Sequence, residues 1–195
     1  MNITRNLVAA AIVAAFPLGV WAQTTGSEVQ RDINQQQRIE QGLQSGALTT
    51  REAARLEKEE SQVNRMQSRA LKDGVLTNAE KARIERAQNK VSRDIYREKH
   101  DAQTGNPNSA SSRRMQADVQ RNINQQKRIE QGVQSGQLTN REAGRLERGQ
   151  ANVDRREARA GADGHVGRAE PRGIQTAENR QSRRVFSQKH DAQTR

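Results

Sequence analysis

The sequence contains no cysteine, only three prolines and very few aromatic residues. Without a thiol the chain forms no disulfide bond and has no attachment point for a lipoprotein lipid. After position 22 its aromatic residues are Tyr96 and Phe186, which are too few for a groove that stacks nucleic-acid bases. Glycine-rich phosphate loops, a G-x-S-x-G turn and a His or Cys metal-ligand cluster are also missing. These absences indicate a protein that is not an enzyme and needs no cofactor.

Long hydrophobic segments are missing as well after residue 22, and the mean hydropathy of the chain is −1.10. A chain of this polarity lacks the apolar residues for a large globular core. Long amphipathic helices can still form, because each helix buries only one narrow apolar stripe. Residues after position 22 are rich in Ala, Arg, Glu and Gln, which favours helices. The composition therefore predicts an all-α protein.

Residues 1–22 have the pattern of a secretory signal peptide. Arg5 is followed by the apolar run Leu7–Phe16 and by Pro17, and this run is too short to span a bilayer. The sequence Val20-Trp21-Ala22 predicts cleavage before Gln23. We therefore expect a periplasmic or secreted protein that has no transmembrane segment after cleavage.

The rest of the chain is a tandem duplication. Residues 33–57, INQQQRIEQGLQSGALTTREAARLE, align without a gap on residues 123–147, INQQKRIEQGVQSGQLTNREAGRLE, and the same offset of 90 residues places KHDAQT (99–104) on KHDAQT (189–194). The sequence predicts a first repeat unit over 23–103, a linker over 104–112 and a second repeat unit over 113–195. The linker reads TGNPNSASS, and its first residue is also the last residue of the KHDAQT repeat. It leaves open whether the linker is helical or flexible, and whether the two units pack together.

A short motif recurs at 45–57, 73–85 and 135–147 and, with more changes, at 163–175. Each of the first three copies has a glycine, then a leucine two residues later, then a threonine. Glycine at a helix end can adopt the left-handed conformation, and Thr-x-x-Glu can form a capping box at the start of the next helix. The expected capping pairs are Thr49 with Glu52, Thr77 with Glu80, and Thr139 with Glu142. We call each Gly-x-Leu-Thr turn a joint, and a joint this short makes the flanking helices antiparallel neighbours.

Apolar residues between the joints recur at helical spacing. The expected core positions of the first unit are Val29, Ile33, Leu43, Leu56, Val63, Ala70, Ile84, Val91 and Ile95. The sequence thus predicts two tandem three-helix units of long antiparallel helices joined by short Gly-x-Leu-Thr turns. In the second unit, Gly161 replaces Leu71 and Gln181 replaces Val91, and Pro171 enters the start of the last helix. That helix is expected to start late, with residues 161–175 as the least ordered part.

Positive charge is unevenly distributed along the chain. Residues 23–112 hold 15 basic and 13 acidic groups, whereas residues 113–195 hold 18 basic and 10 acidic groups. The excess in the second unit suggests contact with a polyanion or an anionic surface, and the alternative is a mixed-charge solvated surface. The candidate polyanion-contacting residues are Arg155, Arg156, Arg168, Arg172, Arg183 and Arg184.

Other candidate sites have weaker support. Asp73-Gly74 with Glu80 matches the second half of an EF-hand loop, but Arg69 and Leu71 stand where the first calcium ligands are needed. The equivalent segment at 163–170 has the same defect.

The histidines and the two aromatic residues also have plainer interpretations. His100 and His190 are expected to be surface residues at helix C-termini, where they complement the helix dipole. Tyr96 and Phe186 are expected to close the end of the small core, with ligand stacking as the alternative.

The joint sequences resemble a known signature. Leu48-Thr49-x-x-Glu52, Leu76-Thr77-x-x-Glu80 and Leu138-Thr139-x-x-Glu142 are similar to the L-T-x-x-Q motif of the periplasmic Spy/CpxP family, with Glu in place of Gln. The resemblance covers a few residues per joint. It implies an all-helical, ATP-independent periplasmic chaperone or envelope-stress protein with a basic concave surface. The duplicated pattern also resembles tandem-repeat secreted proteins of Gram-negative bacteria.

The first functional hypothesis is a non-enzymatic periplasmic or secreted helical interaction protein. Its partner would be an envelope protein, an anionic polymer or lipid, or an unfolded client as for a chaperone. The alternative is a structural helical protein that self-assembles into homo-oligomers, and a degenerate calcium binder is a third hypothesis. No sequence-specific contact with nucleic acid is expected.

Overall fold

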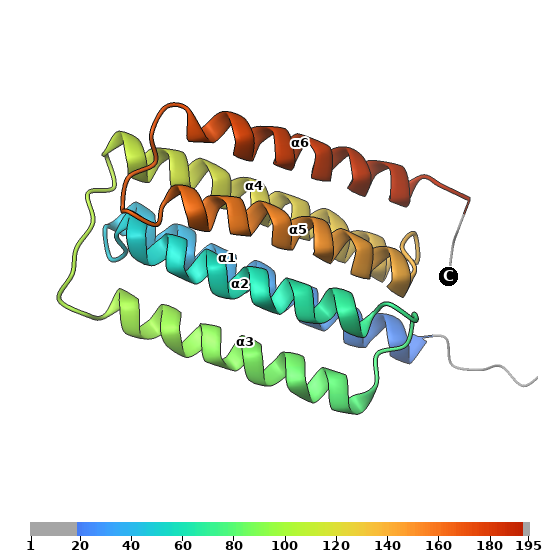
Figure 1. The fold of residues 1–195 in the computed structure, drawn as a ribbon. Coiled ribbons are helices and arrows are strands. Elements are labelled where there is room, and N and C mark those ends of the chain that lie inside the picture. Colours follow the sequence, from blue (N-terminus) through green and yellow to red (C-terminus); the bar gives the residue numbers. More distant parts are fainter. Residues whose placement is uncertain (1–18, 193–195) are drawn as a thin grey trace, which may run out of the picture.

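The computed structural model describes residues 19–192, which form six helices and no strand (Figure 1). The helices are α1 (Gly19–Ser45), α2 (Thr50–Ala70), α3 (Asn78–Lys99), α4 (Ala110–Gln134), α5 (Asn140–Ala160) and α6 (Glu170–Lys189). The all-α prediction is confirmed, with three helices in each repeat unit. Of the predicted signal peptide, residues 1–18 lie outside the described residues. Within the described range no helix combines the length and the hydropathy needed to cross a membrane.

The joints turn the chain as their sequence predicts. Gly46, Gly74, Gly136 and Gly164 have φ values of 78°, 91°, 75° and 87°, the left-handed region that glycine tolerates. Both halves of the capping box are present at the starts of α2, α3 and α5. The last helix lacks a side-chain cap, and it begins at Glu170 with a proline in its first turn. This late start was expected from Pro171.

In the joint between the first two helices of each unit, the leucine packs against the helix that precedes the joint. The Leu48 amide donates to the Gly42 carbonyl at 2.9 Å, and a Cβ on Gly42 would lie 2.5 Å from Leu48 Cδ1. Gly132 and Leu138 repeat this arrangement in the second unit. The missing side chain of the glycine therefore makes room for the leucine, a pairing that sequence reasoning overlooked.

The two units pack face to face, and their most extensive helix contacts join α2 to α5 and α1 to α4. Arg51 at the start of α2 donates to the Asp163 carbonyl beyond the end of α5, and Arg141 at the start of α5 donates to the Asp73 carbonyl beyond the end of α2. These two bonds are equivalent under the offset of 90 residues, so α2 and α5 run antiparallel about an approximate twofold axis. Figure 1 shows α3 and α6 on opposite outer sides of this four-helix centre.

The linker is extended and attached to the first joint. Gly105 N donates to the Gly46 carbonyl at 2.8 Å, and α4 begins at Ala110, so the last three residues assigned to the linker are helical. A Cβ on Gly105 would collide with the Leu48 carbonyl and would lie 3.1 Å from Thr49 Cα. The linker is thus part of the packed structure.

Gly105→Ala is therefore expected to destabilise the protein, because backbone atoms of the joint cannot move aside cheaply. We expect a loss of about 2 kcal/mol, measured as a lower midpoint in urea unfolding. Gly173→Ala is the matched control, since Gly173 lies in α6 with nothing within 4 Å of an added Cβ. That substitution should leave stability unchanged or raise it by up to about 1 kcal/mol. Equal destabilisation by both variants would contradict this account of the linker.

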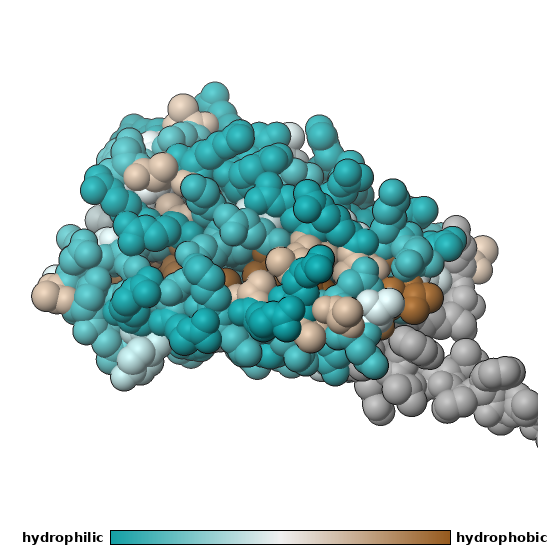
Figure 2. Space-filling view, turned by 60° about the horizontal axis from the view of Figure 1, so that its bottom comes forward, coloured by the Kyte–Doolittle hydropathy of each residue, from teal (hydrophilic) through white to brown (hydrophobic). Residues whose placement is uncertain are grey.

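The interior combines the predicted apolar residues with many polar ones. All nine expected core positions of the first unit are buried, and they belong to one hydrophobic cluster that spans both units. The same interior contains buried acids and amides from α2 and α5, among them Glu57, Glu60, Glu147 and Asp154. Hydrophilic residues cover most of the face seen in Figure 2, and hydrophobic residues show mainly in a narrow band across its middle.

The replacement of Leu71 by Gly161 in the second unit has a packing reason. A Cβ on Gly161 would lie 2.7 Å from Ala54 Cβ and 2.6 Å from Met115 Cε. Met115 is buried and fills the space beside this glycine. The change is thus compensated by neighbouring residues and is not simply a lost core side chain.

Candidate functional site

The exposed face of α2, continued by Lys72 just beyond its end, carries basic residues at most of its turns. Arg51, Arg55, Lys58, Arg65, Arg69 and Lys72 follow one another at steps of four, three, seven, four and three residues, with Gln62 in the single wide gap. Alternating steps of four and three keep side chains on one side of a helix. All six side chains are exposed except Arg65, which is half-buried. The helix therefore presents one continuous basic stripe to solvent.

The second unit repeats this stripe on α5. The exposed basic residues there are Arg141, Arg145, Arg148, Arg155, Arg156 and Arg159. Asn152 is the residue equivalent to Gln62 in the duplication. Five of them stand 90 residues after a basic residue of α2. Because α2 and α5 are antiparallel neighbours, the two stripes lie side by side. We call these twelve residues the basic face.

A groove runs between the two stripes. It is lined by seven basic side chains together with Ser68, Gly144 and Asn152, and no carboxylate lines it. The basic residues are Arg65, Arg69, Lys72, Arg141, Arg145, Arg148 and Arg155. Of the twelve residues of the basic face, one forms an ion pair within the described residues: Arg55 pairs with Glu98 at 3.3 Å. The remaining positive charges are therefore available to an external anion.

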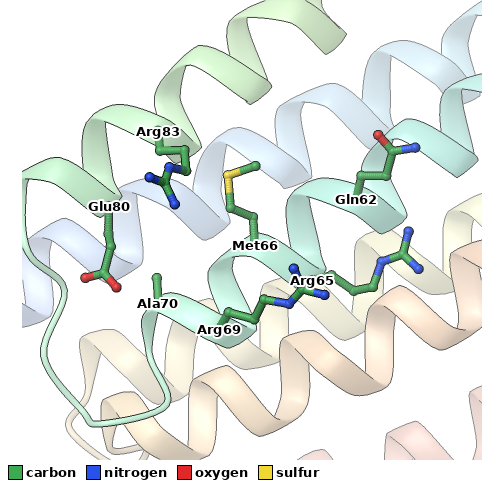
Figure 3. Close-up of a pocket in the computed structure, with 7 residues that line it drawn as sticks. All are labelled: Gln62, Arg65, Met66, Arg69, Ala70, Glu80 and Arg83. Carbon is green, nitrogen blue, oxygen red and sulfur yellow. The ribbon is translucent and has the colours of Figure 1, made fainter.

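Two neighbouring grooves widen the basic face. Figure 3 shows the one between α2 and α3, where Met66 points towards α3 while Arg65 and Arg69 extend along the side that faces α5. The other lies between α5 and α6 and is lined by Arg155, Arg156, Arg180 and Arg184. The positive surface thus extends from α2 across α5 to α6, whereas the α3 side of the first groove carries both Arg83 and Glu80.

The acidic residues of α2 and α5 do not line the groove between these two helices, and all are buried except Glu59, which pairs with Lys90 of α3. Burial raises the pKa of Asp32, Asp118 and Asp154 to about 7. Burial also raises the pKa of Glu57, Glu60, Glu147 and Glu157 well above the usual value. No Lys, Arg or His of the described residues is buried with them. The separation leaves the outer surface more positive than the composition suggests.

The six arginines proposed from the sequence are exposed, but the structure does not bring them all together. Arg155 and Arg156 belong to the basic face, and Arg184 lines the groove next to it. Arg168, Arg172 and Arg183 line none of the three basic grooves. The sequence argument placed the site in the second unit, whereas half of the basic face comes from α2 of the first unit. The regular spacing of basic residues in α2 was the signal that would have found it.

The half-EF-hand segments act as turns in this structure. Asp73 Oδ1 accepts the Val75 amide at 3.0 Å, and Glu80 accepts the Thr77 amide at 3.0 Å. Asp163 accepts the His165 amide in the same way. These carboxylates therefore stabilise the joints through backbone hydrogen bonds.

Tyr96 and Phe186 do not close the core, so that prediction is wrong. Their exposed fractions are 61% and 59%. Tyr96 stacks on His100 with ring centroids 4.1 Å apart, and Phe186 stacks on His190 at 4.2 Å. The aromatic rings lie outside because the buried ends of α3 and α6 are occupied by Ile95 and Val185. The two histidines lie at helix C-termini, as predicted.

Comparison of the chain with protein-family models, curated proteins and solved structures finds no match in any of the three. The class of protein is therefore defined by its own structure, an all-helical duplication with a basic face over an acidic interior.

Proposed function

We propose that the protein is a non-enzymatic interaction protein that binds an extended anionic polymer along the basic face. The observation that supports this is the groove between α2 and α5, lined by seven basic side chains and no carboxylate. The stripe from Arg51 to Lys72 extends over about 32 Å at 1.5 Å per residue, so a linear chain with repeated phosphate, sulfate or carboxylate groups can contact many arginines at once. Arginine favours such groups because its planar guanidinium binds two oxygens together.

The basic face is also confined to one side of the molecule. Figure 1 shows α1 and α4 behind α2 and α5, and the exposed residues of that rear side are mostly neutral. They include Gln30, Asn34, Gln41 and Gln44 on α1, and Asn124, Gln131 and Gln134 on α4. A general increase in solubility needs no such asymmetry, whereas directed binding does.

Binding of unfolded clients, which the Spy/CpxP resemblance implies, has less support. The exposed large hydrophobic residues of the described chain are Val75, Tyr96 and Phe186, and they are scattered over different elements. Unfolded chains are usually captured by contiguous apolar patches. Electrostatic binding of a polyanion needs no such patch.

The proposal is tested by fluorescence anisotropy with labelled polyphosphate and with dextran sulfate as probes. If about five anionic groups are contacted, affinity should fall about a hundredfold when salt rises fourfold. Vesicles that contain phosphatidylglycerol, measured under the same conditions, distinguish a membrane surface from a polymer. Binding to vesicles but not to either polymer would contradict the proposed partner.

Arg145→Gln combined with Arg148→Gln should weaken polymer binding about tenfold and reduce its salt dependence. Both side chains are exposed and form no ion pair within the described residues, so the fold should be preserved. The matched control is Arg113→Gln with Lys127→Gln, which removes the same charge from exposed positions on α4. An equal loss in both double variants would show a nonspecific effect of net charge and would contradict the assigned face.

A further inference from the structure

Three buried carboxylates meet at the interface between the two units. Ligand oxygens of Glu57 on α2 and of Asp154 and Glu157 on α5 all lie within 4.8 Å of one another. Each of these side chains is 0% exposed. Like charges at this separation repel strongly in a medium of low dielectric constant, so the group needs a compensating positive charge or a proton.

The surrounding amides orient these carboxylates, and some of the carboxylate oxygens remain without a hydrogen-bond partner. Gln36 donates to Glu57 Oε2 at 3.0 Å, Asn122 donates to Glu157 Oε2 at 2.7 Å and Asn64 donates to Asp154 Oδ2 at 2.7 Å. The other oxygens of Glu57 and Glu157, both Oε1, have no hydrogen-bond partner. Glu57 and Glu157 thus each have one oxygen held by an amide and one without a partner, as in a metal ligand oriented by its surroundings. Asp154 differs, because Gln150 also donates to its Oδ1 at 3.1 Å.

Neighbouring side chains add further acceptors that have no partner. Glu60 is 0% exposed and neither of its carboxylate oxygens has a partner, and the amide oxygen of Asn64 is also unpartnered. Every unpartnered buried side-chain atom in the described residues is an oxygen. A bound cation would stabilise these buried oxygens, because they have no hydrogen-bond donor to compensate them.

The duplication shows that this group is particular to one side of the interface. The positions equivalent to Glu57, Asp154 and Glu157 are Glu147, Asn64 and Gln67. Two of the three acids are therefore replaced by amides of nearly the same shape across the approximate twofold axis. The helix packing itself accepts amides, so packing alone does not account for three acids on one side.

A second acidic group illustrates the difference. Glu52, Glu98 and Asp101 also approach within 4.8 Å, but Arg55 pairs with Glu98 at 3.3 Å and Glu52 caps α2. That group already has a cation and backbone donors from the protein.

We propose that Glu57, Asp154 and Glu157 bind a hard divalent cation between the two units. Three carboxylates with no imidazole or thiolate suit Mn²⁺, Ca²⁺ or Mg²⁺ better than Zn²⁺ or Cu²⁺. The bound cation would join α2 of the first unit to α5 of the second, and so hold the duplicated halves together. This inference concerns a different part of the molecule from the basic face and does not depend on polymer binding.

Proton binding is the competing way to neutralise the group. The charged groups that act on the three ligands are Asp32, Glu60, Glu147, Asp118 and Glu178, all acidic, and the surrounding amides are neutral. Cations compete with protons for carboxylates, so cation binding should weaken as the pH falls. The experiment must therefore separate the two.

The full chain is unfolded in denaturant with a chelator, then refolded at about pH 8 with MnCl₂, CaCl₂, MgCl₂ or chelator alone. Because the site is buried, refolding gives the cation access. After gel filtration, the wild-type protein should retain about one equivalent of at least one of the three cations by mass spectrometry of the metal. Its melting temperature should then exceed that of the chelated sample by about 5 °C.

Asp154→Asn with Glu157→Gln introduces the residues that the first unit has at the equivalent positions. This variant should refold without retaining the cation, and its melting temperature should not respond to it. Glu147→Gln is the matched control, since it removes one buried carboxylate on the other side of the interface, and it should still retain the cation. If the double variant does not refold, Glu57→Gln takes its place in the same measurement.

Failure of the wild-type protein to retain any of the three cations would overturn the proposal in favour of protonated carboxyls. Undiminished retention in the double variant, or in Glu57→Gln where that replaces it, would place the cation elsewhere and would overturn it as well. Neither result bears on polymer binding, which is measured on the natively purified protein.

Discussion

Raising the pH from about 5 to about 8 should lower the melting temperature of the chelator-treated protein by about 10 °C. The cause is the set of buried carboxyls between the units. Asp32 and Asp154 have pKa values of about 7 in the folded protein, against an ordinary value of 3.8. Of one such shift, the part between pH 5 and pH 7 corresponds to about 3 kcal/mol, which for a chain of this length is a change in melting temperature of about 10 °C.

The direction follows from which state holds more protons. Between pH 4 and 7 the folded protein keeps protons on these carboxyls, whereas the unfolded chain releases them. Stability is therefore fully present below about pH 4 and is lost as the pH rises through about 7. Carboxylates with a lowered pKa, such as Asp94 beside Lys90, act in the opposite direction, but they titrate below this range.

The measurement is a series of thermal unfolding curves by circular dichroism in chelator, across this pH range. Asp154→Asn with Glu157→Gln should flatten the dependence, because it replaces two of the buried carboxyls by amides that do not titrate. With a retained cation, the wild-type protein should lose less stability at the higher pH. A melting temperature that rises steadily from pH 5 to pH 8 in chelator would contradict the carboxyl interior as the controlling feature.

Gly144→Leu should destabilise the protein by about 3 kcal/mol, because it separates the two central helices. Gly144 lies on α5 beside the end of α2, and a Cβ there would lie 2.8 Å from Leu71 Cβ. Both atoms are attached to backbone, so the helices must move apart. Urea unfolding measures the loss, and Asn152→Leu, an exposed position on the same helix, controls for the added side chain.

A double-variant cycle tests whether the contact itself is responsible. Leu71→Gly alone should cost about 3 kcal/mol through the cavity that it leaves. Combined with Gly144→Ala, it reproduces the pairing of Ala54 with Gly161 found on the other side of the interface. The two effects should therefore be less than additive by about 1 kcal/mol. Simple additivity would show that residues 71 and 144 do not restrict each other.

Local structure followed closely from the sequence. The capping boxes and left-handed glycines depend on residues within a few positions of one another, so the joints and helices were predictable from their spacing. The apolar seam positions were predictable for the same reason. The basic stripe of α2 was equally visible in the steps of four and three residues, but counting charge by halves of the chain drew attention to the second unit alone.

The structure also explains why Tyr96 and Phe186 were misplaced. Their position near the end of a helix seam suggested burial, but each step of one residue along a helix rotates the side chain by about 100°, and this decides whether it faces the core. Ile95 and Val185, one residue earlier, face inward and leave the rings exposed.

By itself, then, the sequence determined the six helices, the joints between them and the duplication, because each depends on contacts between nearby residues or on a repeated pattern. Only the tertiary structure decided that Glu57, Asp154 and Glu157 meet in the interior and that the arginines of both units share one surface. In a single three-helix unit Glu57, Glu60 and Asn64 of α2 would face water. They are buried because α5, some 90 residues further along the chain, packs antiparallel against α2, and a contact at that distance leaves no local trace in the order of the residues.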